Sequence, residues 1–78
     1  MYLEIITPDQ LIYQDQVKRV RLPGTSGLFE ILNNHAPIVA TLDKGTIRVI
    51  DVNNNTFKFE VTGGIVENKN NKIIVLLD

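Results

Sequence analysis

The sequence predicts a single all-β domain over residues 1–78, and the pattern is typical of a β-sandwich or a small barrel. Isoleucine, valine and threonine supply roughly a third of the residues, and these β-branched side chains favour a pleated sheet. Apolar and polar residues alternate in short runs, and turn residues interrupt them about every 8 to 12 positions. No stretch has a clear helical period.

The first strand is expected over residues 2–7, where Leu3 and Ile5 share one face. The segment 7–10 then reads as a turn with Pro8 at its second position. Extended structure resumes at residues 11–13.

A further strand is expected over residues 17–22. Val20 and Leu22 alternate with polar positions, but Val17 is out of phase with Val20. This change of phase predicts a β-bulge between the two valines.

Residues 22–37 are rich in glycine, proline and asparagine, the residue types that favour turns, and contain the only histidine, His35. Pro23 fixes φ, while Gly24 and Gly27 allow positive φ, so the chain is expected to turn before a strand over 28–32. A second, fixed turn is expected over residues 33–37.

The second half repeats the pattern, with the clearest alternation in the strand around Phe57, Phe59 and Val61. The expected strands are 45–50, 57–61, 65–66 and 72–77, and they are separated by turns at 52–56, 63–64 and 68–71.

Composition excludes several classes of function. The chain has no cysteine, which removes disulfides and thiol catalysis. Eight basic and nine acidic residues give a net charge of −1, which argues against a nucleic-acid surface. No apolar run approaches the roughly 20 residues of a membrane span, and no leader pattern is seen, so we expect a soluble chain that is not exported.

His35 permits several interpretations. It could act as a general base, but it has no companion cysteine, and the only serine, Ser26, lies nine residues away on a loop. A metal site would need scattered carboxylates such as Asp43 or Glu30, without a ligand spacing to support it. The segment from Gly24 to Gly27 resembles a phosphate cradle but lacks the lysine and the helix of a P-loop. We expect a histidine that stabilises the 33–37 turn, or an interface contact.

Two surface features remain open. Lys18, Arg19 and Arg21 form a small basic cluster, which is either a solvated face or a contact for an acidic partner. Leu28 follows the glycine-rich turn, and it is either tucked inward or presented to another protein.

The order of these segments resembles the epsilon subunit of F-type ATP synthase along the whole chain. The matching pieces are Leu3-Glu4-Ile5-Ile6-Thr7-Pro8, Leu22-Pro23-Gly24-x-x-Gly27-x-Phe29-x-Ile31-Leu32, His35-Ala36-Pro37, Gly45-x-Ile47-Arg48-Val49 and Gly63-Gly64-Ile65-x-Glu67. Five collinear pieces in 78 residues make the resemblance specific.

The resemblance implies a β-sandwich of two antiparallel, five-stranded sheets, hence about ten short strands. It implies a non-catalytic rotor part of the central stalk, without cofactor, metal or bound nucleotide, that links the gamma subunit to the c-ring and transmits proton-driven rotation. The residues expected at the c-ring are Thr25, Ser26, Gly27 and Leu28, and those expected to face gamma are Thr7, His35 and Ala40. The implied location is peripheral, on the cytoplasmic face of a bacterial inner membrane.

Three departures from the family pattern stand out. Glu30 replaces a usual glycine, so its side chain should face solvent or pair across an interface. Asn33-Asn34 replaces a usual Pro-Gly, and an asparagine at the second position can still reach positive φ. The sequence ends at Asp78, so we expect no inhibitory helical hairpin and no ATP binding.

Two alternatives from other classes remain. A free-standing β-sandwich module could bind a carbohydrate or peptide, but such sites normally expose aromatic side chains, and most of the five aromatic residues here are in phase with a core. A small enzyme centred on His35 is the other alternative. Co-purification with a gamma subunit would separate these interpretations.

Overall fold

The computed structural model describes all 78 residues and contains eight β-strands and no helix. None of its segments is a helix that is long and apolar enough to cross a bilayer. The strands are β1 (Tyr2–Ile6), β2 (Leu11–Gly24), β3 (Gly27–Leu32), β4 (Ile38–Leu42), β5 (Gly45–Asp51), β6 (Thr56–Val61), β7 (Gly64–Lys69) and β8 (Lys72–Leu77).

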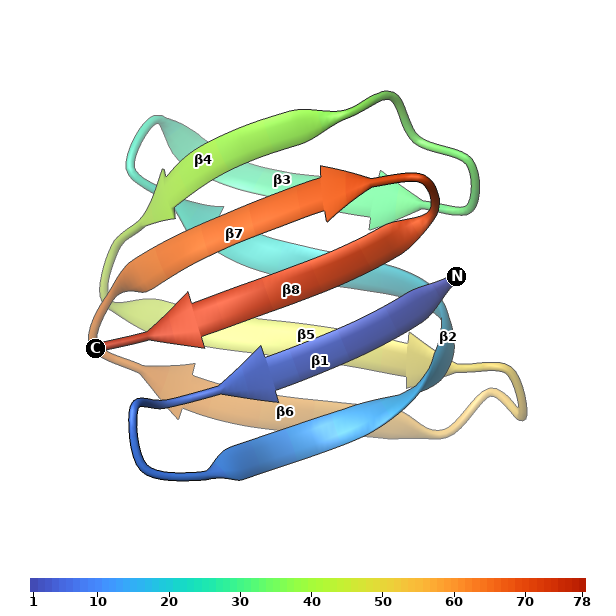
Figure 1. Ribbon diagram of the computed structural model, residues 1–78, viewed down its shortest axis with the longest axis horizontal. Helices are drawn as coiled ribbons and strands as arrows, with labels where there is room; N and C mark the ends of the chain where they lie inside the picture. The colour runs from blue at the N-terminus through green and yellow to red at the C-terminus, as the bar shows by residue number, and fades with distance from the viewer.

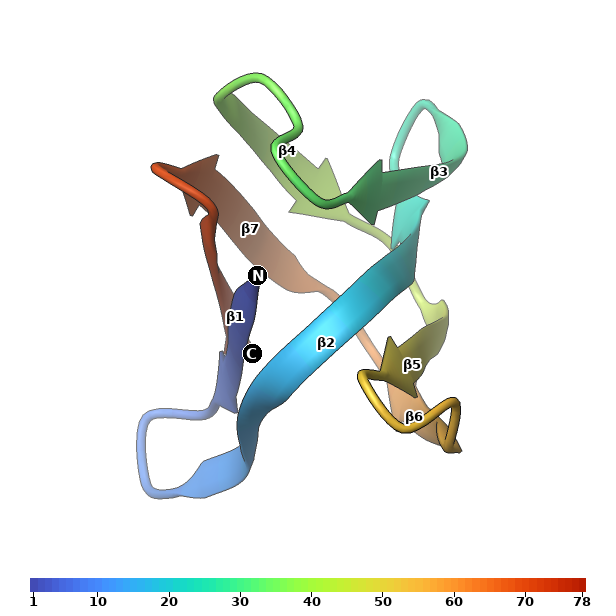
Figure 2. The same cartoon turned by 90° about the vertical axis from the view of Figure 1, so that its right-hand side faces the viewer.

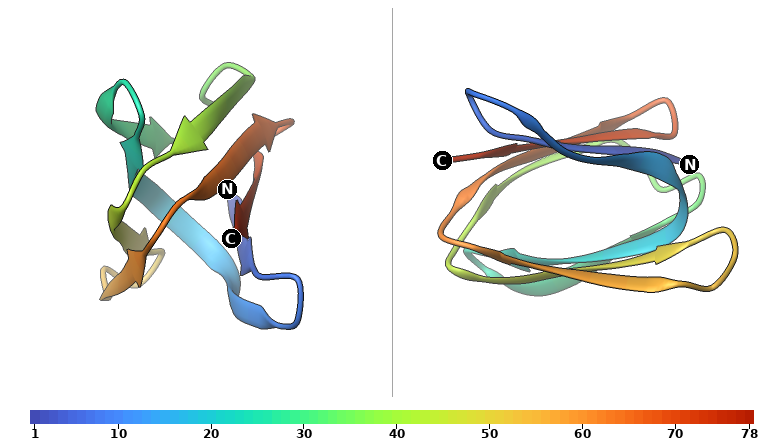
Figure 3. Two further views of the ribbon diagram at one scale, coloured as in Figure 1. Left: turned by 90° about the vertical axis from the view of Figure 1, so that its left-hand side faces the viewer. Right: turned by 90° about the horizontal axis from the view of Figure 1, so that it is seen from below.

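Hydrogen bonds join the strands in the order β1-β8-β7-β4-β2-β5-β6, with β3 attached to β2 and a further pairing between β1 and β2. The sheet folds over into two layers, seen edge-on in the right-hand view of Figure 3. The C-terminus and the loops after β1, β2, β4 and β6 lie together on the left-hand side of Figure 1. The predicted β-sandwich is confirmed, with eight strands in place of about ten. One pairing, β1 with β8, is parallel, so the sheets are not purely antiparallel.

The long strand β2 links the two layers, and Figure 2 shows it crossing the molecule diagonally. Its first half pairs with β1, and its second half pairs with β5 on one side and β3 on the other. The register against β5 shifts between Val17 and Arg19, which confirms the predicted bulge. The expected break after Tyr13 is absent, because residues 14–16 continue the ladder with β1.

Every strand contributes alternate side chains to one core between the layers, as the period of two requires. The fully buried side chains include Leu3 and Ile5, which were expected to share one face, as well as Val20, Leu22, Ile47 and Val49. Tyr13 lies against Phe57 and Phe59, with ring centroids 5.4 Å away in each case, so most aromatic surface is used in packing.

The turns depend on asparagine and glycine. Asn34 has φ 63°, so the second residue of the Asn33-Asn34 pair takes the left-handed conformation as expected. Asn70 and Asn71, at φ 53° and 61°, form the two-residue hairpin between β7 and β8. This turn is shorter than the predicted 68–71 segment, because Asn68 and Lys69 still belong to β7.

Candidate interaction surface

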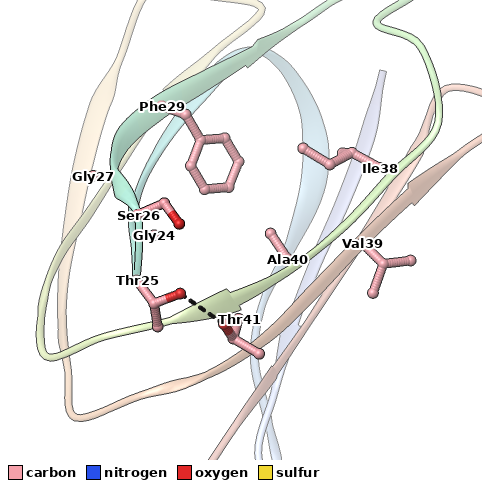
Figure 4. A pocket seen from close by; sticks show the side chains of 9 residues that line it. All are labelled: Gly24, Thr25, Ser26, Gly27, Phe29, Ile38, Val39, Ala40 and Thr41. Carbon is pink, nitrogen blue, oxygen red and sulfur yellow. Dashed lines mark hydrogen bonds between the residues drawn. The ribbon is translucent and has the colours of Figure 1, made fainter.

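The candidate site is a cleft between β3 and β4, the two strands whose neighbouring edges do not pair with each other (Figure 4). β3 pairs only with β2, and β4 pairs with β7 and meets β2 at the single pair Gly24–Leu42. The cleft has a volume of about 440 Å³. Its lining comprises Gly24, Thr25, Ser26, Gly27, Phe29, Ile38, Val39, Ala40 and Thr41.

One end of the cleft is closed by the turn between β2 and β3. The Thr25 N–H donates to the Thr41 carbonyl oxygen at 3.0 Å, and the two threonine hydroxyls lie 2.8 Å apart. Glycine is required at position 24 because neighbouring atoms leave no room for a side chain. It is not required for a positive φ, because Gly24 does not have one. A Cβ on Gly24 would lie 2.8 Å from both the Gly27 carbonyl oxygen and the ring of Phe29.

Residues 33–37 connect β3 to β4 and lie away from the β2–β3 turn. The His35 N–H donates to the Leu32 carbonyl at 3.1 Å, and the Nδ1 atom of the exposed His35 ring lies 2.7 Å from the Ala36 carbonyl oxygen. Asn68, which is 2% exposed, donates its side-chain amide to the carbonyls of His35 and Ala36 at 3.2 and 3.3 Å. These contacts agree with the interpretation of His35 as a residue that stabilises a shaped turn.

The chemistry of the cleft favours docking over reaction. Phe29, Ile38 and Ala40 supply apolar surface, and Figure 4 shows the Phe29 and Ile38 side chains on facing strands. Hydroxyl groups line the rim, and no charged side chain is present. Such a cleft can take an apolar side chain, and its unpaired strand edges can offer backbone hydrogen bonds to a partner.

A Ser26–His35 pair is excluded by distance. The two residues flank the two ends of β3, and six extended residues span about 20 Å. Ser26 therefore cannot donate its proton to His35. No group of three or more histidine, aspartate or glutamate side chains is placed to hold a metal ion.

The residues predicted to contact the c-ring and gamma are only partly brought together. Thr25, Ser26 and Gly27 line the cleft together with Ala40. Leu28 points to the other side of β3, where it is 69% exposed and borders a second depression with Arg21, Pro23, Asp43 and Lys44. This exposure rules out the alternative in which Leu28 is tucked inward.

Thr7 lies apart from the cleft, in the loop between β1 and β2. Its hydroxyl accepts hydrogen bonds from the N–H groups of Asp9 and Gln10 at 3.3 and 3.2 Å. Its own N–H donates to the Gln10 carbonyl at 2.9 Å. The predicted turn at 7–10 is therefore present, and the Thr7 side chain stabilises it.

Phe29, Ile38 and Thr41 line the cleft but were not among the predicted site residues. β4 was not identified as a strand, because five residues between Pro37 and Asp43 give little alternation to detect. That β3 faces β4 depends on the tertiary structure and not on local sequence. The only sequence feature that could have indicated these three residues is their apolar or β-branched character.

Asp51 does not line this site; it lies at the end of β5, at the start of the turn to β6. Hydrogen bonds from the Asn55 N–H, the Asn55 side chain and the Asn53 N–H, with a smaller effect of Lys18, hold the pKa of Asp51 below its ordinary value. Asn54 has φ 66°, and its side-chain oxygen accepts a hydrogen bond from Lys18 Nζ at 2.6 Å. These groups stabilise a turn and have no catalytic arrangement.

Comparisons with known proteins agree with the sequence resemblance. The family model of the ATP synthase delta/epsilon chain β-sandwich domain matches residues 1–78. The ATP synthase epsilon chain of Desulforamulus reducens is 41% identical over 76 residues, which is 97% of this chain and 57% of that protein. The epsilon chain of Chlorobaculum tepidum is 36% identical over 76 residues and is covered to 86% of its length. The chain thus spans little more than half of the first relative and most of the second.

Solved structures share the fold. A chain in the Euglena gracilis mitochondrial ATP synthase, in an assembly of OSCP, F1 and c-ring, aligns with a TM-score of 0.89 at 19% identity. The alignment covers 96% of this chain and 48% of that one. A chain in the central stalk and c-ring of the Tetrahymena thermophila enzyme aligns with a TM-score of 0.81 at 21% identity, over 99% of this chain and 62% of that one.

Proposed function

The chain belongs to the family of ATP synthase delta and epsilon chain β-sandwich domains, and we propose that it is a non-catalytic rotor part that joins the gamma subunit to the c-ring. In this role it transmits proton-driven rotation and contributes to ATP synthesis without binding a nucleotide, metal or cofactor. Its location is then peripheral, on the cytoplasmic face of the membrane that holds the c-ring.

One observation carries the proposal for the contacts. The β2–β3 turn and the middle of β4 border the same cleft, so Thr25, Ser26 and Gly27 lie near Ala40. A domain with this arrangement can touch the ring with the tip of the turn and the stalk with the adjacent strand edge. Leu28, exposed beside the turn, offers an apolar contact for the c-ring loops.

The role of His35 in this proposal is a shaped contact with gamma. Its backbone is fixed by Leu32 and by Asn68, while the ring itself is exposed. A joint that carries torque needs a stiff body, and a single core inside two hydrogen-bonded layers supplies one. Thr7 belongs to a different part of the surface and contributes a third, separate gamma contact.

Cysteine cross-linking within the co-expressed complex tests the assignment sharply, because the native chain has no cysteine. Leu28→Cys should cross-link to a c subunit, and Ala40→Cys and His35→Cys should cross-link to gamma. Asn70→Cys, at the β7–β8 hairpin, is the matched exposed control and should give neither product. A folded chain that fails to co-purify with gamma would contradict the proposed function and favour a free-standing binding module.

A further inference from the structure

The outer faces of β2, β5 and β6 carry a transverse row of basic side chains. Arg21 lies directly opposite Arg48 in the register of β2 and β5, and Arg48 lies directly opposite Lys58 in the register of β5 and β6. Directly opposite residues of paired strands project from the same face. Both arginines flank fully buried side chains, Val20 and Val49 among them, which fixes the row on the outer face.

The row has little compensation within the chain. Glu30 stands opposite Arg21 on β3, but the only ion pair of the structure joins it to Arg19, with 3.6 Å between Nη1 and Oε2. Glu60, one row away, accepts a hydrogen bond from the Thr46 hydroxyl at 2.6 Å. Three neighbouring cations therefore remain without a carboxylate partner. Like charges directly opposite each other destabilise a sheet, so packing within the domain does not account for the row.

We propose that this row, Arg21, Arg48 and Lys58, is a docking surface for an acidic helix of a partner protein. Adjacent strands are about 4.8 Å apart, so the three cations span about 10 Å. Glutamates at positions i, i+4 and i+7 of a helix lie on one face and also span about 10 Å. Alternate residues of a β-strand are about 7 Å apart, so a third acidic residue of a strand would overshoot the row by about 4 Å.

The surroundings of the row fit an amphipathic helix better than a membrane. Leu32, 52% exposed, stands on the same face of β3 one row away and offers a contact for an apolar side chain of the helix. The chain has a net charge of −1, and the two glutamates Glu30 and Glu60 border the row. Arg19 is a fourth basic residue on this face, but it pairs with Glu30. The three unpaired cations are fewer than the about four to eight basic residues on which binding to anionic lipid relies.

The basic cluster of Lys18, Arg19 and Arg21 that the sequence shows is divided in the structure. Lys18 turns to the β5–β6 tip, where it contacts Asn54, while Arg19 pairs with Glu30. Only Arg21 of that cluster joins the row, and its partners come from β5 and β6. The surface lies on the outside of the layer, whereas the cleft lies between β3 and β4, so this proposal stands independently of the proposed rotor function.

A synthetic helical peptide of about 18 residues, with glutamates at i, i+4 and i+7 and leucines beside them, is the probe. Calorimetry should detect binding, and the Arg21→Gln/Arg48→Gln variant should weaken it at least about tenfold. Lys69→Gln/Lys72→Gln removes the same charge at the β7–β8 hairpin and should change the affinity less than about twofold. Raising the salt concentration from about 50 to 200 mM should weaken binding to the native chain.

The melting temperature of each variant separates a loss of binding from a loss of the folded structure. Arg48→Gln should raise the melting temperature, because it relieves repulsion with both neighbours, while it weakens peptide binding. A lower melting temperature would contradict the premise that the row is uncompensated. Equal binding of a peptide with glutamines in place of glutamates would overturn the proposal. The proposal would also be overturned if both Arg21→Gln/Arg48→Gln and the single variant Lys58→Gln bound the peptide with the affinity of the native chain. Binding to phosphatidylglycerol vesicles but not to the peptide would overturn it as well.

Discussion

The hydroxyl oxygens of Thr25 and Thr41 lie 2.8 Å apart and join the β2–β3 turn to β4 at one end of the cleft. The backbone bond from the Thr25 N–H to the Thr41 carbonyl, at 3.0 Å, lies beside this contact. Apart from the pairing of Gly24 with Leu42, β2 and β4 share no register. These two contacts, together with the Asp43 N–H that donates to the Pro23 carbonyl at 2.7 Å, therefore hold the turn beside the strand.

Thr41→Val should remove the hydroxyl contact and keep the shape of the side chain. Because the bond is exposed, we expect a loss of about 0.5 to 1 kcal/mol in the free energy of unfolding, measured by urea denaturation. Thr62→Val is the control, since its exposed side chain has no hydrogen bond, and it should stay within about 0.5 kcal/mol of the native chain. Equal losses in the two variants would contradict a role for the contact.

Gly64→Ala should be among the most damaging substitutions of the chain. Gly64 has φ 156°, and an added Cβ would collide with the backbone carbonyl oxygen of Leu76 on the paired strand β8. Backbone cannot yield as a flexible side chain does, so we expect a loss of about 2 to 4 kcal/mol by urea denaturation.

Gly27→Ala is the matched control for this prediction. Its φ of 125° is also unfavourable, but nothing lies within 4 Å of an added Cβ. The cost should reflect backbone strain alone, about 1 to 2 kcal/mol. If Gly27→Ala were the more damaging of the two, the collision with Leu76 would not govern the behaviour of Gly64.

Asn68→Ala should loosen the turn that holds His35. The substitution leaves the carbonyls of His35 and Ala36 without the Asn68 amide and opens space at a position that is 2% exposed. We expect a loss of about 1 to 3 kcal/mol, with faster amide exchange confined to residues 33–37. Asn53→Ala, whose exposed side chain makes no hydrogen bond, should change neither quantity. Unchanged exchange at 33–37 in Asn68→Ala would contradict the assignment.

The stability of the domain should fall in acid partly through Asp51. The pKa of this carboxyl is lower in the folded chain than its usual value, because the Asn55 and Asn53 groups donate hydrogen bonds to the ionised form. The folded state therefore binds this proton less readily than the unfolded state. Its contribution is complete above the unfolded pKa of about 4 and is lost as the pH falls through the folded value.

Melting temperatures between pH 7 and pH 2.5 check this prediction. Asp51→Asn should melt at a lower temperature than the native chain at pH 7, and the difference should shrink as the pH falls below about 4. Asp9→Asn changes an exposed carboxylate that accepts no hydrogen bond, and its melting curve should parallel that of the native chain. A difference for Asp51→Asn that stays constant across the range would show that the ionised form is not specifically stabilised.

Local features of the chain were predictable because each depends on a few neighbouring residues. The alternation around Leu3 and Ile5 defined β1 and its buried face, and the phase change between Val17 and Val20 located the bulge. The left-handed Asn34 followed from the tolerance of asparagine for positive φ. β4 was not predicted, because a five-residue strand offers too few alternations of apolar and polar residues. The continuation of β2 between residues 13 and 17 was not predicted either, because polar side chains also occupy solvent-facing strand positions.

The sequence by itself determined the all-β class, most strand faces, the turn chemistry and the resemblance to a known family. Only the tertiary structure decided which surfaces these elements make together. It set β3 beside β4 to form a cleft, separated Ser26 from His35 by the length of a strand, and aligned Arg21 with Arg48 and Lys58 from three different strands. The physical reason is register: side-chain period is a local property of the backbone, whereas the pairing of distant strands depends on the whole core being buried at once.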